Sequence, residues 1–282
     1  MATKEKKVLL YHPHVNHMDG NFGDLLDAIC LEIGSEKVVD VGEVKLVFRL
    51  SKEDSVWFIR LQELKADELP KIADFENGAN EKNLDLPDGK GLSYRNVFAY
   101  DEAKNIIASV KISGCPQNGR LKRCIESITK EIGILEKVTV RFSIIFEKGL
   151  VEKIRNAEVI SVAEFSSLDY DGSSISEDRF SKYKDYIGGK DYSKITTIKG
   201  KNGANIKGVL QPVIDDFISH EDGALPVAIK MDIDNEPVDF QRYYKVRRIQ
   251  VAMDNQSSKH VDYDDLLTKL KKIVGEYKED EE

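Results

Sequence analysis

The chain has few of the residues that mark the commoner catalytic and metal sites. Its 282 residues include three cysteines, five histidines and one tryptophan. The cysteines are odd in number and lack metal-ligand spacing, which is typical of reduced, buried thiols. No serine or cysteine nucleophile stands in a recognisable motif, and no glycine loop has the phosphate-cradling pattern. The sequence therefore names no reaction, and we expect a non-enzymatic protein without a cofactor.

Long hydrophobic runs are also missing. No segment approaches the roughly 18 apolar residues that would indicate a membrane span. The first apolar run, Val8 to Leu10, is too short for a signal peptide. A share of 41% hydrophobic and 33% charged residues is typical of an ordinary soluble domain. These features favour a cytoplasmic protein that does not insert into a membrane.

The hydrophobic pattern predicts an α+β fold class: an antiparallel, hairpin-rich sheet with packed amphipathic helices. Apolar residues at helical spacing predict a helix over Phe22–Ile33, with Asn21 as its N-cap and Gly34 as its stop. Two hairpins are expected, over residues 44–64 and 96–112, because β-branched and aromatic residues flank short polar turns.

The composition changes after Ser166, where serine, aspartate, glycine and lysine become dominant. We therefore predict an N-terminal α+β domain over residues 1–166 and a basic, Gly/Lys-rich connector over 167–208. A smaller C-terminal α+β domain over 209–282 is expected to end in an amphipathic helix with an apolar face from Leu266 to Tyr277.

Two basic segments are the main candidates for function. Arg179–Gln211 has eight Lys or Arg against two acidic residues, whereas the whole chain has a formal net charge of −8. Arg242–Arg248 is a second basic and aromatic run, expected to form an extended strand with cations on both faces. Clustered cations with interleaved rings suit a phosphate backbone, although a solvated hinge and a charge-protected edge strand remain alternatives. The candidate nucleic-acid contacts are Lys182, Lys184, Lys190, Lys199, Lys201, Arg242, Arg247 and Arg248.

Two further clusters could be interpreted as metal sites. Three histidines lie between His12 and His17, but their spacing matches no strong zinc motif, and solvated or hydrogen-bonded histidines are the alternative. Four acidic residues between Asp232 and Asp239 could hold a divalent cation, as in many nucleases. The same residues are also typical of a turn between two strands. We expect no metal at either place.

The order of elements resembles a known family. A helix over Gly20–Ile29 leads into the hairpin Val44–Arg60, the strand pair Asn96–Asp101 and Ile106–Val110, and the strand Lys137–Phe146. With the C-terminal amphipathic helix, this order is similar to the RexA-type proteins of phage exclusion and abortive infection systems. The resemblance implies a cytoplasmic, dimeric DNA-binding protein that senses phage infection and signals to an effector protein. It transfers no catalytic residue.

These observations lead to one functional hypothesis and two alternatives. The hypothesis is sequence-independent binding of nucleic acid, double-stranded DNA above all, as a sensor or regulator in phage defence. The first alternative is a protein-interaction subunit whose basic segment docks an acidic partner. The second is a metal-dependent nuclease that uses the acidic cluster from Asp232 to Asp239. Whether the basic segments share one face stays open.

Overall fold

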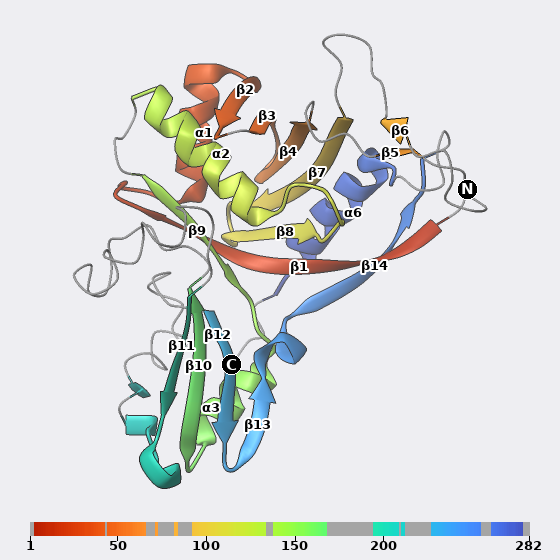
Figure 1. The fold of residues 1–282 in the computed structure, drawn as a ribbon. Helices are drawn as coiled ribbons and strands as arrows, with labels where there is room; N and C mark the ends of the chain where they lie inside the picture. The colour runs from red at the N-terminus through yellow and green to blue at the C-terminus, as the bar shows by residue number, and fades with distance from the viewer. Residues whose placement is uncertain are drawn as a thin grey trace. The chain divides into compact units, whose positions relative to one another are not determined.

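The chain forms two compact units in the computed structural model: Met1–Ile144 with Val246–Glu282, and Ile145–Lys245. Both units are built on antiparallel strands, so the predicted α+β class is confirmed (Figure 1). The structure describes residues 3–42, 44–65, 71–72, 82–83, 92–133, 138–167, 194–208, 210–211, 227–254 and 261–278.

Unit 1 contains the larger sheet, in which every neighbouring pair of strands is antiparallel. The strand order is β14-β1-β8-β7-β4-β3-β2, and β9 also pairs with β1. The two expected hairpins are present as β3–β4 and β7–β8. The strands are β1 (Thr3–Asn16), β2 (Glu36–Val41), β3 (Val44–Glu53), β4 (Val56–Lys65), β7 (Leu92–Asp101), β8 (Ile106–Val110), β9 (Thr139–Ile144) and β14 (Val246–Ala252), with a separate short pair β5 (Lys71–Ile72) and β6 (Lys82–Asn83).

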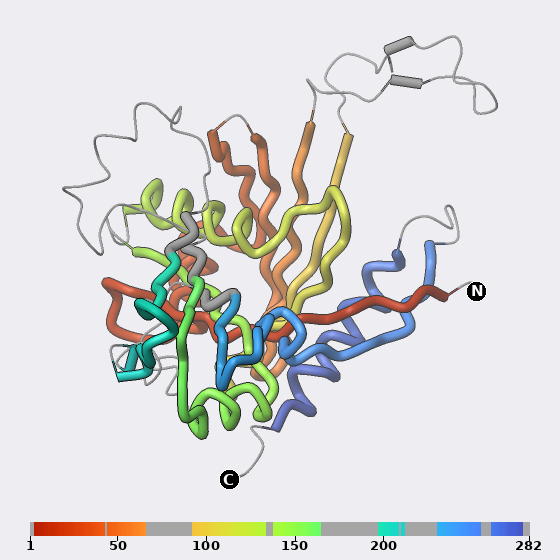
Figure 2. The backbone as a smooth tube through the Cα atoms, turned by 60° about the horizontal axis from the view of Figure 1, so that its bottom comes forward, coloured from red at the N-terminus to blue at the C-terminus, as the bar shows by residue number. Residues whose placement is uncertain are grey.

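Helices cover the two faces of this sheet unequally. The helices α1 (Phe22–Ile33) and α2 (Asn118–Glu131) bury their apolar faces against one side, where the rings of Phe22 and Tyr100 meet edge to face. Helix α6 (Tyr263–Glu276) packs on β7, β8 and β14 from the other side (Figure 2). No helix within the described ranges has the length and apolar character needed to cross a membrane.

Unit 2 has a smaller antiparallel sheet in the order β11-β10-β12-β13. Its buried side chains include Leu150 and Ile154 from the helix over Lys148–Asn156, and Ile233 and Phe240 from later in the chain. The elements are α3 (Lys148–Asn156), β10 (Ile160–Ser167), β11 (Lys194–Lys199), the short 3-10 helix η1 (Lys201–Gly203), β12 (Val227–Ile233), β13 (Glu236–Asp239) and the 3-10 helix η2 (Phe240–Tyr243).

The units differ from the division that the composition indicated. The C-terminal helix was expected in a domain over residues 209–282, but α6 and β14 belong to unit 1 with the N-terminal strands. Their apolar residues explain the difference, since Leu266, Leu270 and Val251 are completely buried there. Of the expected connector, residues 168–193 lie outside the described part, while β11 is a strand of the unit 2 sheet.

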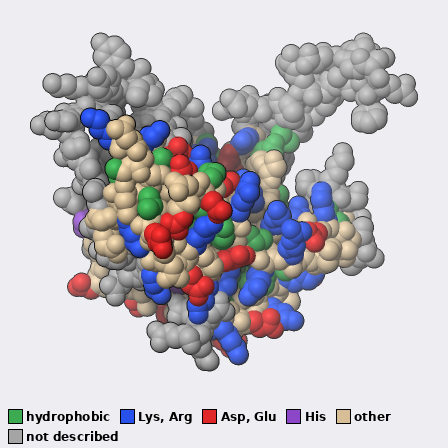
Figure 3. All heavy atoms as spheres, turned by 90° about the horizontal axis from the view of Figure 1, so that it is seen from below, with side chains coloured by type: hydrophobic (Ala, Val, Ile, Leu, Met, Phe, Trp, Pro, Cys, Tyr) green, Lys and Arg blue, Asp and Glu red, His purple; other side chains and the backbone are tan. Residues whose placement is uncertain are grey.

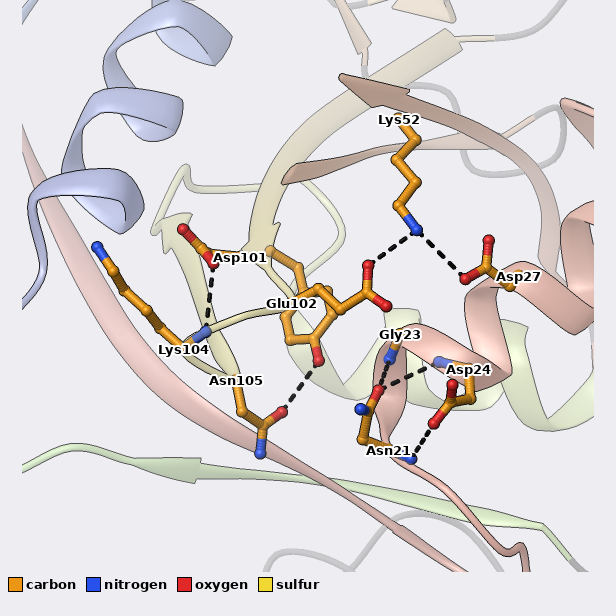
Figure 4. Close-up of polar contacts among 10 residues, drawn as sticks. Asn21, Gly23, Asp24, Asp27, Lys52, Asp101, Glu102, Lys104 and Asn105 are labelled. Carbon is orange, nitrogen blue, oxygen red and sulfur yellow. Dashed lines mark hydrogen bonds and ion pairs between the residues drawn. The ribbon is translucent and has the colours of Figure 1, made fainter. Parts of the chain in front are cut away.

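The start of α1 is fixed by a reciprocal pair of hydrogen bonds, as predicted from Asn21. Asn21 Oδ1 accepts from the backbone N–H groups of Gly23 at 2.7 Å and Asp24 at 3.2 Å, and Asp24 Oδ2 accepts from Asn21 N at 2.7 Å (Figure 4). This capping box satisfies N–H groups that have no partner inside the helix.

Lys52 lies between Glu102 at 2.8 Å and Asp27 at 3.2 Å, which links β3 to α1. The hydrogen bond to Glu102 is the main cause that raises the pKa of Lys52.

We expect Asn21→Ala to lower the free energy of unfolding by about 1 kcal/mol, because the cap acceptor is lost. Asn21→Asp keeps an acceptor at the same place and is the matched control. Urea unfolding followed by far-UV circular dichroism measures both. Equal stability of Asn21→Ala and the wild type would contradict the cap.

Asp265 joins α6 to β14 and gives a stability that depends on pH. Its Oδ2 accepts from Ala252 N and from Lys269 Nζ, each at 2.7 Å. Burial alone would raise its pKa, but these hydrogen bonds outweigh burial and hold the pKa below the ordinary 3.8. A depressed carboxyl pKa stabilises the folded state above the unfolded value, and the contribution is lost as the pH falls through the folded value.

Asp265→Asn should therefore lower the free energy of unfolding at pH 7 by on the order of 1 kcal/mol, since the site is partly exposed. The difference from the wild type should shrink as the pH falls from about 5 to about 3. Urea unfolding across this range measures it, with Asp264→Asn as a control in the same helical turn. A difference that does not change with pH would contradict the assignment.

Candidate nucleic-acid interface

The N-terminal part of β1 and the strand β14 form a two-stranded ribbon at the edge of the unit 1 sheet. Thr3–Leu9 pairs with Val246–Ala252, whereas pairing with β8 begins only at Val8. Within the described ranges, residues 3–7 are thus hydrogen-bonded to β14 alone. We call Thr3–Leu9 and Val246–Ala252 the basic ribbon.

Five cations lie on the basic ribbon and only one acidic residue, Glu5, lies among them. Alternation along a strand places them on both sides of the ribbon. Lys7 lies opposite Arg248 on one side, and Val8 lies opposite Arg247 on the other. Figure 3 shows Lys and Arg side chains gathered toward the side where β1 and β14 run together in Figure 1. The cations are Lys4, Lys6, Lys7, Arg247 and Arg248.

The charges on the basic ribbon are poorly neutralised by the residues that the structure describes. Arg248 Nη1 lies 2.9 Å from Glu5 Oε1, but both side chains are largely exposed, and such pairs contribute little. Lys7 directly opposite Arg248 is a cross-strand pair of like charges, which is unfavourable. Lys4, Lys7 and Arg247 have neither an ion pair nor a hydrogen-bond partner among the described side chains. A bound polyanion would relieve this repulsion.

The structure divides the predicted contact residues between the units. Arg247 and Arg248 lie on the basic ribbon of unit 1. Lys199, Lys201 and Arg242 are exposed in unit 2, at the end of β11, in η1 and in η2 respectively. The remaining three predicted residues, Lys182, Lys184 and Lys190, lie outside the described part of the chain.

The expectation of one continuous strand over Arg242–Arg248 is wrong. Phe240–Tyr243 forms η2, and β14 begins only at Val246. Asp239 starts the 3-10 turn by accepting from Gln241 N at 3.0 Å, and the ring of Phe240 is completely buried. A local cap and a buried ring thus override the extended pattern. Arg242 therefore does not share a strand face with Arg248.

Lys4, Lys6 and Lys7 were missed as candidates from the sequence. Their signal is the short run Lys4-Glu5-Lys6-Lys7 directly before the apolar residues of β1. Such a run resembles an ordinary polar terminus until its partner strand is known. That partner follows more than two hundred residues later, and no local pattern announces the pairing.

The acidic residues between Asp232 and Asp239 form hydrogen bonds and ion pairs with neighbouring protein groups. Asp234 Oδ1 accepts from Glu158 N at 2.9 Å and from Val159 N at 2.8 Å, and Glu236 pairs with Lys153 at 3.1 Å. His12, from the other cluster, lies with Nδ1 3.2 Å from the carbonyl oxygen of Asn105. Among the residues that the structure describes, no three His, Cys, Asp or Glu side chains converge as a metal ion would require.

Comparison with known proteins adds no family to this geometry. No protein-family model matches the chain, and no curated protein matches it significantly. The resemblance to RexA-type proteins stays a prediction.

Proposed function

We propose that this protein binds nucleic acid without sequence preference and without catalysis, through the basic ribbon. The observation that supports the proposal is the convergence of five cations, from the first and the last strand of the described chain, around a single glutamate. Each cation that meets a phosphate releases counterions, which supplies affinity independent of base sequence. Exposed, poorly paired lysines and arginines are suited to that role.

The shape of the basic ribbon favours a duplex. A two-stranded β-ribbon fits the major groove of B-form DNA, and cations on both of its sides suit the phosphates on the two sides of a groove. The basic ribbon has no aromatic residue on which the bases of a single strand could stack. Gln250 is its only side-chain amide, so base reading would be limited. Double-stranded DNA is therefore the proposed ligand.

The wider role remains a proposal with narrower support. The sequence resemblance alone supports a role as a sensor in phage exclusion. In that role the protein would form a homodimer and act on an effector protein. A protein-interaction subunit is the second candidate, because β14 is the last strand of its sheet within the described ranges, and α6 bonds to the outer backbone groups of Gln250 and Ala252 only, so the start of β14 is the edge that a partner strand would pair with. An acidic partner would use the same cations as DNA, so competition by polyglutamate separates the two.

The double variant Lys7→Glu with Arg247→Glu should weaken duplex binding by at least about tenfold and reduce the slope of log affinity against log salt by about 2, because two phosphate contacts are lost. Fluorescence anisotropy with an unrelated pair of duplex sequences measures both quantities. Equal effects on the two sequences are expected, since the contacts do not read bases.

The control is Lys130→Glu with Lys272→Glu, exposed positions on α2 and α6 that undergo the same change of charge away from the basic ribbon. It should bind like the wild type. Equal loss in both double variants would mean that net charge alone acts. No binding by the wild type even at low salt would remove the proposed function.

A further inference from the structure

Three arginines lie side by side on one face of the unit 1 sheet. Arg49 of β3 is directly opposite Arg60 of β4. Arg60 is opposite Val97 of β7, so Arg95, two residues before Val97, is its diagonal neighbour. Residues two apart on a strand share a face, which places all three guanidinium groups on one side. We call Arg49, Arg60 and Arg95 the arginine row.

The three members of the arginine row differ in how they are neutralised. Arg49 donates to both carboxylate oxygens of Glu36, at 2.8 and 3.1 Å, and to Gln62 at 3.0 Å. The guanidinium of Arg95 lies 5.4 Å from the ring centre of Tyr263. Arg60 is half-buried and has no ion pair or hydrogen-bond partner within the described ranges. Glu36 neutralises Arg49, so Arg60 is the half-buried cation of the row without a counter-ion within the described ranges, which is unfavourable unless an anion binds there.

The arginine row lies on the part of the sheet that its helix leaves open. On this side α6 packs on β7, β8 and β14, so β4, β3 and β2 extend beyond it. Lys271 of α6 lies 6.0 Å from the ring centre of Phe58 and pairs with Glu53 at 3.0 Å, so α6 covers the turn end of β3 and β4, whereas the arginine row lies farther from that turn. Farther out, Val38 of β2 is on the same side and its residue is 52% exposed. The surface is thus reachable from solvent.

The same side of the sheet also carries three cations of the basic ribbon, Lys4, Lys6 and Arg247. Lys6 and Val8 lie on the same side of β1, and Val8 is paired with Val110 of β8. Ala108, two residues before Val110, is on that side too and is paired with Ala99 of β7. Ala99 follows Arg95 by four residues, so Arg95 also lies on this side. Cys115 connects the two regions, because its thiol lies within electrostatic reach of Lys6 and close to Tyr263 and the backbone of Arg95. Because Val110, Ala108 and Ala99 are completely buried, the exposed route for a chain of phosphates from Lys6 to Arg60 passes beside Cys115 and Tyr263, at the start of α6.

We propose that the arginine row binds the phosphates of a single nucleic-acid strand, so that the preferred ligand is a duplex with a single-stranded extension. This inference rests on the proposed function. We expect an extended single strand, which is narrower than a duplex, to reach the half-buried Arg60 guanidinium beside α6 more readily than the broad rod of a duplex. Arginine binds phosphate with two parallel hydrogen bonds, and its flat face, like the Tyr263 ring, accepts a stacked base.

The test is Arg60→Gln in the full chain, measured against a blunt duplex, a single strand and a tailed duplex of equal length. The variant should bind the single strand and the tailed duplex about tenfold more weakly, with a salt slope smaller by about 0.7, because one phosphate contact is lost. Binding to the blunt duplex should not change. The urea midpoint should stay the same or rise, since the repulsion with Arg49 is removed. A merely structural arginine would instead lower it.

Arg155→Gln, an exposed arginine on α3, is the matched control and should bind all three ligands like the wild type. Unchanged binding of every ligand by Arg60→Gln would overturn the inference while the proposed function stands. An equal loss for blunt and tailed duplexes would also overturn it. If polyglutamate binds more tightly than the single strand, and if this binding is lost in Arg60→Gln, the arginine row would instead bind an acidic protein, and the inference would be overturned. A wild type that binds none of the three DNAs would remove both proposals.

Discussion

Strand β1 is hydrogen-bonded to three other strands, and the architecture of unit 1 depends on that pairing. Over its 14 residues it meets β14 along Thr3–Leu9, β8 along Val8–Tyr11 and β9 along Tyr11–Asn16. A strand with so many partners joins regions that are far apart in sequence. It brings β14 into the N-terminal sheet, and α6 follows because it is directly connected to β14 through a short link. The basic ribbon exists because β1 and β14 continue their pairing beyond Val110, the last residue of β8.

The unequal covering of the sheet explains where polar residues are tolerated. A helix is about 10 Å wide and neighbouring strands are about 4.8 Å apart, so one helix shields only two or three strands. Two helices bury the side with Phe48, Trp57 and Tyr100. The single helix α6 leaves part of the other side to water, and arginine, glutamine and serine occupy that part. The arginine row is therefore compatible with folding, and the Arg49–Arg60 repulsion is a cost that water and a bound anion both reduce.

Local signals made much of unit 1 predictable from sequence. The cap at Asn21 and the two tight hairpins depend on residues within a few positions of one another, so the pattern alone specifies them. The edge strand β2 and the helix α3 were not predicted, because Glu36–Val41 is short and half polar and Lys148–Asn156 buries only Leu150 and Ile154. The candidate site was predicted only in part, through Arg247 and Arg248. Its other half depends on the pairing of β1 with β14, a contact between the first and the last strand of the described chain that no local pattern encodes.

The net charge of −8 is compatible with a polyanion as ligand because charges act over a limited distance. At physiological ionic strength the screening length is about 8 Å, so acidic residues on distant surfaces have little effect on a phosphate at the basic ribbon. Screening is weaker at low salt, where the acidic remainder would slow the approach of DNA while the ribbon contacts become stronger. Added salt should therefore raise the association rate and lower the affinity. In an entirely basic protein added salt would lower both quantities, so the comparison distinguishes local from global attraction.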